Sequence, residues 1–193
     1  MNDAVETFTP LYHEIFTKVN NAKDKPKKIA VLRKYDTEHL RALLNCAFNP
    51  DIEWMLPEGE VPYIENDAPD GTDHSRLSTE GRLLYNFVKK KIPNSVDYLV
   101  GNPQITDARR EMMFIQLLEG LSAGEAQVLC LAKENTLHRK YKGLTATCVR
   151  EAYGWDENFL DPVEVAKANA NPQQRPSVDL GRMPGDEAMY SRG

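Results

Sequence analysis

An acidic, proline-rich stretch from Phe48 to Ser78 is the feature that most limits how this chain can fold. It contains four prolines and two glycines, and proline removes a backbone donor and blocks helix continuation. Yet the stretch is too apolar for a free linker. We expect a long loop pinned to the rest of the protein, because loops of this length are usually functional or disordered and apolar anchors argue against disorder. The expected anchors are Trp54, Met55, Leu56, Val61, Tyr63 and Ile64.

Helical patterns flank this loop on both sides. Upstream, Thr9–Pro10 and Asp24 are typical helix starts, and a third helix carries an apolar stripe at helical spacing. Downstream, one helix is expected from Ser78 or Thr79 through Lys91, where three lysines suit the negative end of a helix dipole. Another begins at Thr106 and ends at Gly120.

The last part of the helical region has two further start signals. Ser122 and Glu125 form a capping box, in which each side chain satisfies a free amide of the same helix. Thr145 caps a final helix. The pattern as a whole predicts an all-α fold, a compact bundle of about seven helices with the long acidic loop between them.

We divide the chain into a helical domain, residues 1–160 with the loop 48–78 inside it, and an extended C-terminal arm, residues 161–193. The arm has four prolines and few large apolar residues. Ordering such a backbone costs ~1–2 kcal/mol per residue, so we expect it to become ordered only against a partner. The expected contact residues of the arm are Pro162, Pro172, Pro176, Leu180, Met183 and Tyr190.

The net charge of −5 hides a strong partition along the chain. Residues 51–80 hold nine acidic residues and one basic residue, a net charge of −8, so the remainder carries +3. Residues 18–34 hold seven basic residues against one acidic residue. The acidic loop could repel nucleic acid, or could fold back over the basic face and cover it.

A second basic cluster lies at the sequence TLHRKYKGLT. Leu137 and Tyr141 are four residues apart and can both point inward, so the intervening and following basic residues point outward. Gly143 would permit a left-handed turn before the next helix. The first interpretation is a basic helix end that answers the helix dipole, and the second is contact with a phosphate or a partner through His138, Arg139, Lys140 and Lys142.

This layout of helix, turn and helix is compatible with a DNA-binding helix-turn-helix. However, the second helix would offer only Arg150 as a strong base or phosphate contact. Sequence-specific DNA reading is therefore the weaker interpretation of the cluster.

No metal, cofactor or catalytic site is expected. The four histidines fall in four separate elements, the three cysteines are widely spaced, and the chain has no nucleotide-binding or nucleophile motif. It has no apolar run near the ~20 residues of a membrane span and does not begin like a secretory signal. We therefore expect a non-enzymatic protein that works in a virion or in the host cytoplasm and not in a membrane.

Three sequence blocks support a resemblance. They are RREMMFIQLLEGLSAGEAQVLCLAKENTLHRKYKGLTATCVREAYGW, KIAVLRKYDTEHLRALLNCAFNPDIEWMLPEGEVPY and LSTEGRLLYNFVK. In their order they resemble an uncharacterised family encoded by T4-like tailed phages, notably of marine and cyanobacterial hosts. The resemblance covers roughly residues 11–155, leaves out the arm, and implies a phage origin without an activity.

Two functions follow as expectations. The first is a virion structural or assembly component that binds other phage proteins, and its own copies among them, with the arm ordered against neighbours. The second is a regulator that binds nucleic acid or RNA polymerase during infection through its basic residues.

Overall fold

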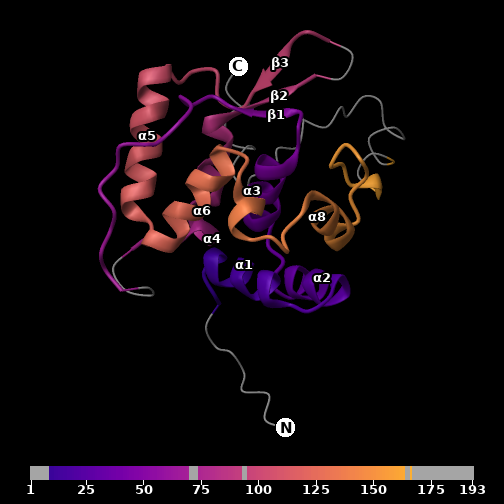
Figure 1. The fold of residues 1–193 in the computed structure, drawn as a ribbon. Coiled ribbons are helices and arrows are strands. Elements are labelled where there is room, and N and C mark those ends of the chain that lie inside the picture. The colour runs from indigo at the N-terminus through magenta and orange to yellow at the C-terminus, as the bar shows by residue number, and fades with distance from the viewer. Residues whose placement is uncertain (1–8, 70–73, 93–94, 164–165, 167–193) are drawn as a thin grey trace.

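A computed structural model describes residues 9–69, 74–92, 95–163 and 166 of the chain. Within these residues lie eight α-helices, one 3-10 helix and a three-stranded antiparallel sheet. The prediction of an all-α fold is therefore wrong, because strands occupy part of the expected loop and part of an expected helix. In Figure 1 the first two helices form the base of the molecule and the sheet lies at the opposite end.

The N-terminal helices are α1 (Tyr12–Asn21), α2 (Lys25–Lys34) and α3 (Glu38–Phe48). The predicted cap of α2 is confirmed: the Asp24 carboxylate accepts the Lys27 amide at 2.9 Å. The predicted start of α1 at Thr9–Pro10 is two residues early, since Leu11 occupies the cap position.

Helix α3 is the central element of the core. It packs against α6 (Ala123–Lys133), the short helix α4 (Leu77–Glu80), the 3-10 helix η1 (Gly81–Phe87) and the strand β1 (Ile52–Trp54). Its predicted apolar stripe is fully buried, with Leu40, Leu43 and Leu44 at 0% exposure. Burial of an apolar side chain contributes roughly 1.5–3 kcal/mol, so this stripe fixes the middle of the fold.

The sheet joins β1 to β2 (Val88–Lys91) and β3 (Tyr98–Val100), with β2 in the centre. Trp54 pairs with Val88, and Ile52 pairs with Lys90. Val88 and Lys90 are buried and alternate along β2 with the more exposed Lys89 and Lys91. Residues 78–91 were expected to be one helix; instead the helical part ends at Phe87. Pairing on both sides supplies β2 with long-range hydrogen bonds that no local helix signal reveals.

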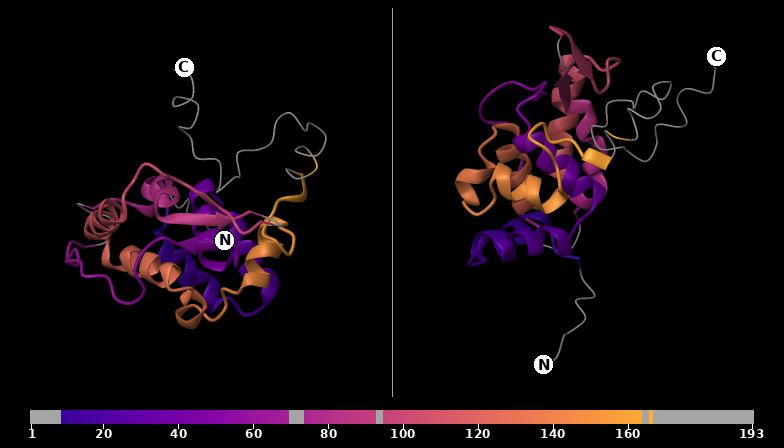
Figure 2. Two further views of the ribbon diagram at one scale, coloured as in Figure 1. Left: turned by 90° about the horizontal axis from the view of Figure 1, so that it is seen from above. Right: turned by 90° about the vertical axis from the view of Figure 1, so that its right-hand side faces the viewer.

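The remaining helices are α5 (Asp107–Gly120), α7 (Leu137–Lys140) and α8 (Ala146–Tyr153). The predicted caps of α5 and α8 are confirmed, since Thr106 accepts the Arg109 amide and Thr145 accepts the Cys148 amide. Helix α8 ends at Gly154, which has φ +69°. Figure 2 shows α5 and α8 at opposite sides of the molecule.

A tight turn follows α8. The Asp156 carboxylate accepts the amides of Asn158 and Leu160 at 2.8 and 3.0 Å, and Trp155 packs on Phe159 with ring centroids 6.1 Å apart. Of the predicted arm contacts, Pro162 is exposed just beyond this turn. The others lie outside the described residues: Pro172, Pro176, Leu180, Met183 and Tyr190.

No helix within the described ranges is long and apolar enough to cross a membrane.

Candidate functional site

The four predicted contact residues lie on α7 and in the turn that follows it. Leu137 and Tyr141 are buried as expected. Their burial turns the neighbouring basic side chains outward, so that His138, Arg139, Lys140 and Lys142 are all exposed. Lys140 reaches the side chain of Gln127 on α6, which is neutral and leaves the lysine charge uncompensated.

The turn after α7 is held against the N-terminal helices. The Gly143 amide donates to the Asn20 side chain at 3.2 Å, and a Cβ added at Gly143 would lie 2.8 Å from Lys28 Nζ and 3.1 Å from the Val19 carbonyl oxygen. The prediction of a left-handed Gly143 is wrong, since its φ is not positive. Glycine is needed here because the two backbones approach closely.

This contact brings two separate basic stretches of the sequence together. Lys28 on α2 lies beside the turn that carries Lys142, and α7 directly precedes that turn. We call the set Lys28, Arg139, Lys140 and Lys142 the basic surface. Among the described residues, none of these four cations forms an ion pair.

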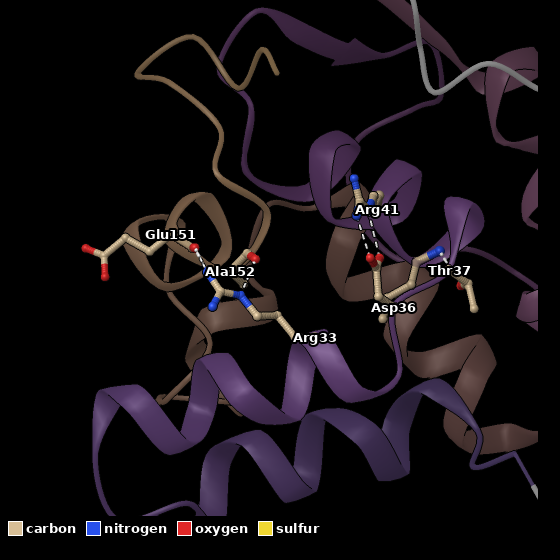
Figure 3. A network of polar contacts seen from close by, with 7 residues as sticks. Arg33, Asp36, Thr37, Arg41, Glu151 and Ala152 are labelled. Atoms are coloured by element: carbon tan, nitrogen blue, oxygen red, sulfur yellow. Dashed lines mark hydrogen bonds and ion pairs between the residues drawn. The ribbon is translucent and has the colours of Figure 1, made fainter. Parts of the chain in front are cut away.

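Other basic residues of α2 are structural. Lys25 pairs with Glu151 of α8 at 2.5 Å. Arg33 donates Nε to the Ala152 carbonyl at 2.8 Å and Nη2 to the Glu151 carbonyl at 2.9 Å. A guanidinium at the last carbonyls of a helix satisfies acceptors that have no partner within the helix and favours the negative end of its dipole. Figure 3 shows Arg33 reaching from α2 to these carbonyls.

These contacts weigh against the helix-turn-helix interpretation. Helix α8 packs against α2, and its residues 151–152 are held by Lys25 and Arg33. Helix α7 is a single turn. A recognition helix must insert one exposed face into the major groove, whereas α8 is engaged by the body of the protein.

The acidic residues of the long loop lie on another flank. Residues 57–69 run in an extended course along α6 and α5, and Figure 1 shows this course beside α5. We call residues 57–69 the acidic segment. Its exposed carboxylates form no ion pair among the described residues; they are Glu58, Glu60, Glu65 and Asp67.

Three hydrogen bonds fix the acidic segment. Lys133 Nζ donates to the Pro57 carbonyl at 2.8 Å, the Gly59 amide donates to Glu134 at 3.1 Å, and the Ile64 amide donates to Glu119 at 3.1 Å. The segment therefore does not fold back over the basic surface, as the sequence had allowed.

The predicted apolar anchors of the loop divide into two groups. Leu56, Val61 and Tyr63 pack against the core, and Trp54 packs there from β1. Ile64, by contrast, is 80% exposed, so its prediction as an anchor is wrong. A large apolar side chain thus stands on the surface among exposed carboxylates.

An open groove of about 710 Å³ lies between the start of the acidic segment and α7. Lys133, Glu134 and His138 line it from one side, and Trp54 and Glu58 line it from the other. His138 thus belongs to this groove more than to the basic surface. No local pattern in the sequence indicates the groove, because its walls come from two distant stretches of the chain, residues 47–58 and 133–138.

The buried charged groups, which are the usual candidates for catalysis, have structural partners. Arg110 is 1% exposed and donates to the carbonyls of Asn86 and Ile105 at 2.9 and 3.0 Å. Glu125 is 0% exposed, and burial raises its carboxyl pKa. It accepts the amides of Tyr12 and Leu77 at 3.0 and 2.8 Å.

The position of Glu125 corrects half of the predicted capping box. Ser122 accepts the Glu125 amide at 3.4 Å, as expected. The Glu125 carboxylate, however, leaves its own helix and serves the starts of α1 and α4. Ser122 and Glu125 are therefore an N-cap and a long-range tie, which the local motif cannot distinguish.

Comparison with known proteins adds one finding. The model of a family of unknown function, DUF6433, matches residues 15–139, which include the acidic segment, the groove and the first part of the basic surface. No curated protein and no solved structure matches the chain significantly.

Proposed function

The chain belongs to DUF6433, a family of unknown function, and from that premise we propose that it is a non-enzymatic protein-binding component of a tailed phage, part of the virion or of its assembly. The observation that carries the proposal is the pair of charged, uncompensated surfaces held on one packed body. Exposed charge without a partner in its own chain is available for electrostatic complementarity with another protein.

Both surfaces are held in place before any partner arrives. The acidic segment is fixed by the hydrogen bonds of Lys133, Glu134 and Glu119, and the basic turn by Asn20. Surfaces that are preorganised lose less conformational entropy on binding. This favours a role in recognition over a role in catalysis. A catalytic role would require the buried charged groups of the described chain to face a substrate.

The phage assignment rests on the resemblance of residues 11–155 to proteins of T4-like tailed phages. The test is mass spectrometry of purified particles of the parent phage, with copy number determined against the major capsid protein. We expect the protein to be present at a fixed stoichiometry. Its absence from particles and from assembly intermediates would overturn the virion and assembly role.

The arm supplies a second test. A chain that ends at residue 161 should keep the helical circular dichroism and cooperative unfolding of the full chain, while its incorporation into particles is lost. Normal incorporation of the shortened chain would remove the arm from the proposal.

The basic surface favours one further candidate, a regulator that binds nucleic acid or RNA polymerase. Cations without acidic partners can neutralise phosphates, and such binding weakens steeply with salt. The test is the affinity for single- and double-stranded DNA at two salt concentrations, for the wild type and for Arg139→Ala/Lys140→Ala/Lys142→Ala. Binding that is absent, or that neither salt nor the substitutions change, would exclude DNA binding through the basic surface.

A further inference from the structure

The two charged surfaces are opposite in sign and equal in number of charges. The acidic segment presents four exposed carboxylates, and the basic surface presents four cations, all without ion pairs among the described residues. An acidic patch and a basic patch attract each other, whereas two patches of the same sign repel each other. Each copy of the chain thus carries both halves of a complementary contact.

The two patches of one copy form no ion pair with each other among the described residues. Three hydrogen bonds hold the acidic segment on α6 and α5. Lys140 contacts the neutral side chain of Gln127 on α6 and no carboxylate of the acidic segment. Neutralisation within one copy would therefore require these anchors to break.

We propose that the acidic segment of one copy binds the basic surface of a second copy. This inference rests on the proposed function and names the partner as the protein itself. Because the contact joins two different patches, it is heterologous, so a pair of copies would still offer one free acidic patch and one free basic patch. Copies would add head to tail and form a ring or an open chain.

A second copy fits the basic surface better than a nucleic acid does. A second copy presents an acidic strip with the exposed Ile64 at its centre, which adds apolar contact to the charge attraction. Exposed ion pairs are individually weak, so we expect a dissociation constant on the order of 0.1–1 mM at low salt.

The experiment is sedimentation velocity of the full chain over a concentration series, at low salt and at roughly 0.5 M NaCl. At the higher salt concentration the Debye length is only a few ångströms, so attraction between exposed charges is largely screened. Two reversals are compared: Arg139→Glu/Lys142→Glu in the basic surface and Glu60→Lys/Glu65→Lys in the acidic segment. Matched controls with the same change in net charge are Lys91→Glu/Arg109→Glu and Glu38→Lys/Glu157→Lys. These control residues are exposed and lie outside both patches.

We expect the wild type and both controls to associate at low salt, and each reversal alone to associate at least about tenfold more weakly. An equimolar mixture of the two reversals should associate again, because the unchanged acidic segment of the first variant can then bind the unchanged basic surface of the second. Recovery on mixing also shows that the variants are folded. Reversals that associate like the wild type, or a mixture that stays monomeric, would overturn the proposal.

Two outcomes separate this inference from the functions above. If the chain stays monomeric but is present in particles at a fixed stoichiometry, self-association fails and the virion role stands. If the chain stays monomeric and binds DNA through Arg139 and Lys142, the basic surface serves nucleic acid and the inference is wrong.

Discussion

The Glu125 carboxylate accepts the backbone amide of Tyr12 at 3.0 Å, across 113 residues of sequence. Its second oxygen accepts the Leu77 amide at 2.8 Å. One fully buried side chain on α6 thus satisfies free amides at the starts of α1 and α4. Helix starts buried without such partners would be costly.

Substitution Glu125→Gln should destabilise the fold. An amide side chain has one acceptor oxygen, so its NH2 group would face one of the two backbone donors. An unsatisfied buried donor costs about 1–3 kcal/mol. Urea unfolding at neutral pH measures this loss, and Glu111→Gln on the exposed side of α5 removes the same charge and should change stability by less than about 0.5 kcal/mol. Equal effects of the two variants would contradict the role of Glu125.

The raised pKa of Glu125 predicts a pH dependence with a definite sign. Burial raises the carboxyl pKa in the native state above its ordinary value, so the native state binds this proton more tightly than the unfolded state does. The stabilisation that this bound proton contributes is present at low pH. It is lost as pH rises from about 4.3, the ordinary pKa of a glutamate, through the raised pKa of the native state. The difference in unfolding free energy between the wild type and Glu125→Gln should therefore narrow as pH rises, and a difference that widens would show the opposite shift.

Two helical glycines should respond to alanine with opposite signs. A Cβ at Gly124 would lie 2.5 Å from His13 Nδ1 and 2.6 Å from its Cγ, so the ring would have to move. At Gly120 the nearest atom is Ser75 Oγ at 3.6 Å, an ordinary contact. We expect Gly120→Ala to raise the thermal unfolding temperature, since alanine favours helix by up to about 1 kcal/mol, and Gly124→Ala to lower it. Stabilisation by both would mean that His13 moves without cost.

The acidic segment should come loose when its lysine anchor is removed. Lys133 is 6% exposed and donates to the Pro57 carbonyl at 2.8 Å. In Lys133→Met the carbonyl loses its donor while the apolar stem is kept. We expect cleavage after Glu58 and Glu60 by a glutamate-specific protease to become faster, with the helical signal of the body retained. The exposed Lys142→Met is the control, and equal cleavage rates in the two variants would show that Lys133 does not hold the segment.

The contact of α2 with α8 depends on the forked geometry of Arg33. Its Nε and Nη2 each donate to one of two successive carbonyls, of Ala152 and Glu151. We expect Arg33→Ala to lower the unfolding free energy by about 1–2 kcal/mol, and Arg33→Lys to recover part of the loss, since lysine keeps the charge but cannot fork. Chemical unfolding checks this order. A lysine variant as stable as the wild type would show that charge alone suffices.

The sequence predicted the helix starts better than the helix ends. Asp24, Thr106 and Thr145 were expected as caps and each accepts an amide three residues ahead. Such bonds depend on residues within one turn, so a local pattern contains the whole interaction. The helix that was expected over residues 78–91 ends at Phe87. No local pattern predicts this end, because β2 forms through pairing with β1 and β3.

The residues of the basic surface also divide into those whose exposure the sequence predicted and one that only the tertiary structure adds. The exposure of Arg139, Lys140 and Lys142 follows from the burial of Leu137 and Tyr141, which their spacing predicts. That Lys28 joins them follows from the approach of two backbones at Gly143, a contact between segments more than a hundred residues apart.

By itself, then, the sequence determined the helix caps at Asp24, Thr106, Ser122 and Thr145, the buried stripes and the partition of charge along the chain, because each depends on neighbours within a few residues. The tertiary structure alone decided the sheet, the long-range tie of Glu125 and the flank on which the acidic segment lies. These rest on hydrogen bonds and packing between distant segments, whose partners are chosen only when the whole core closes.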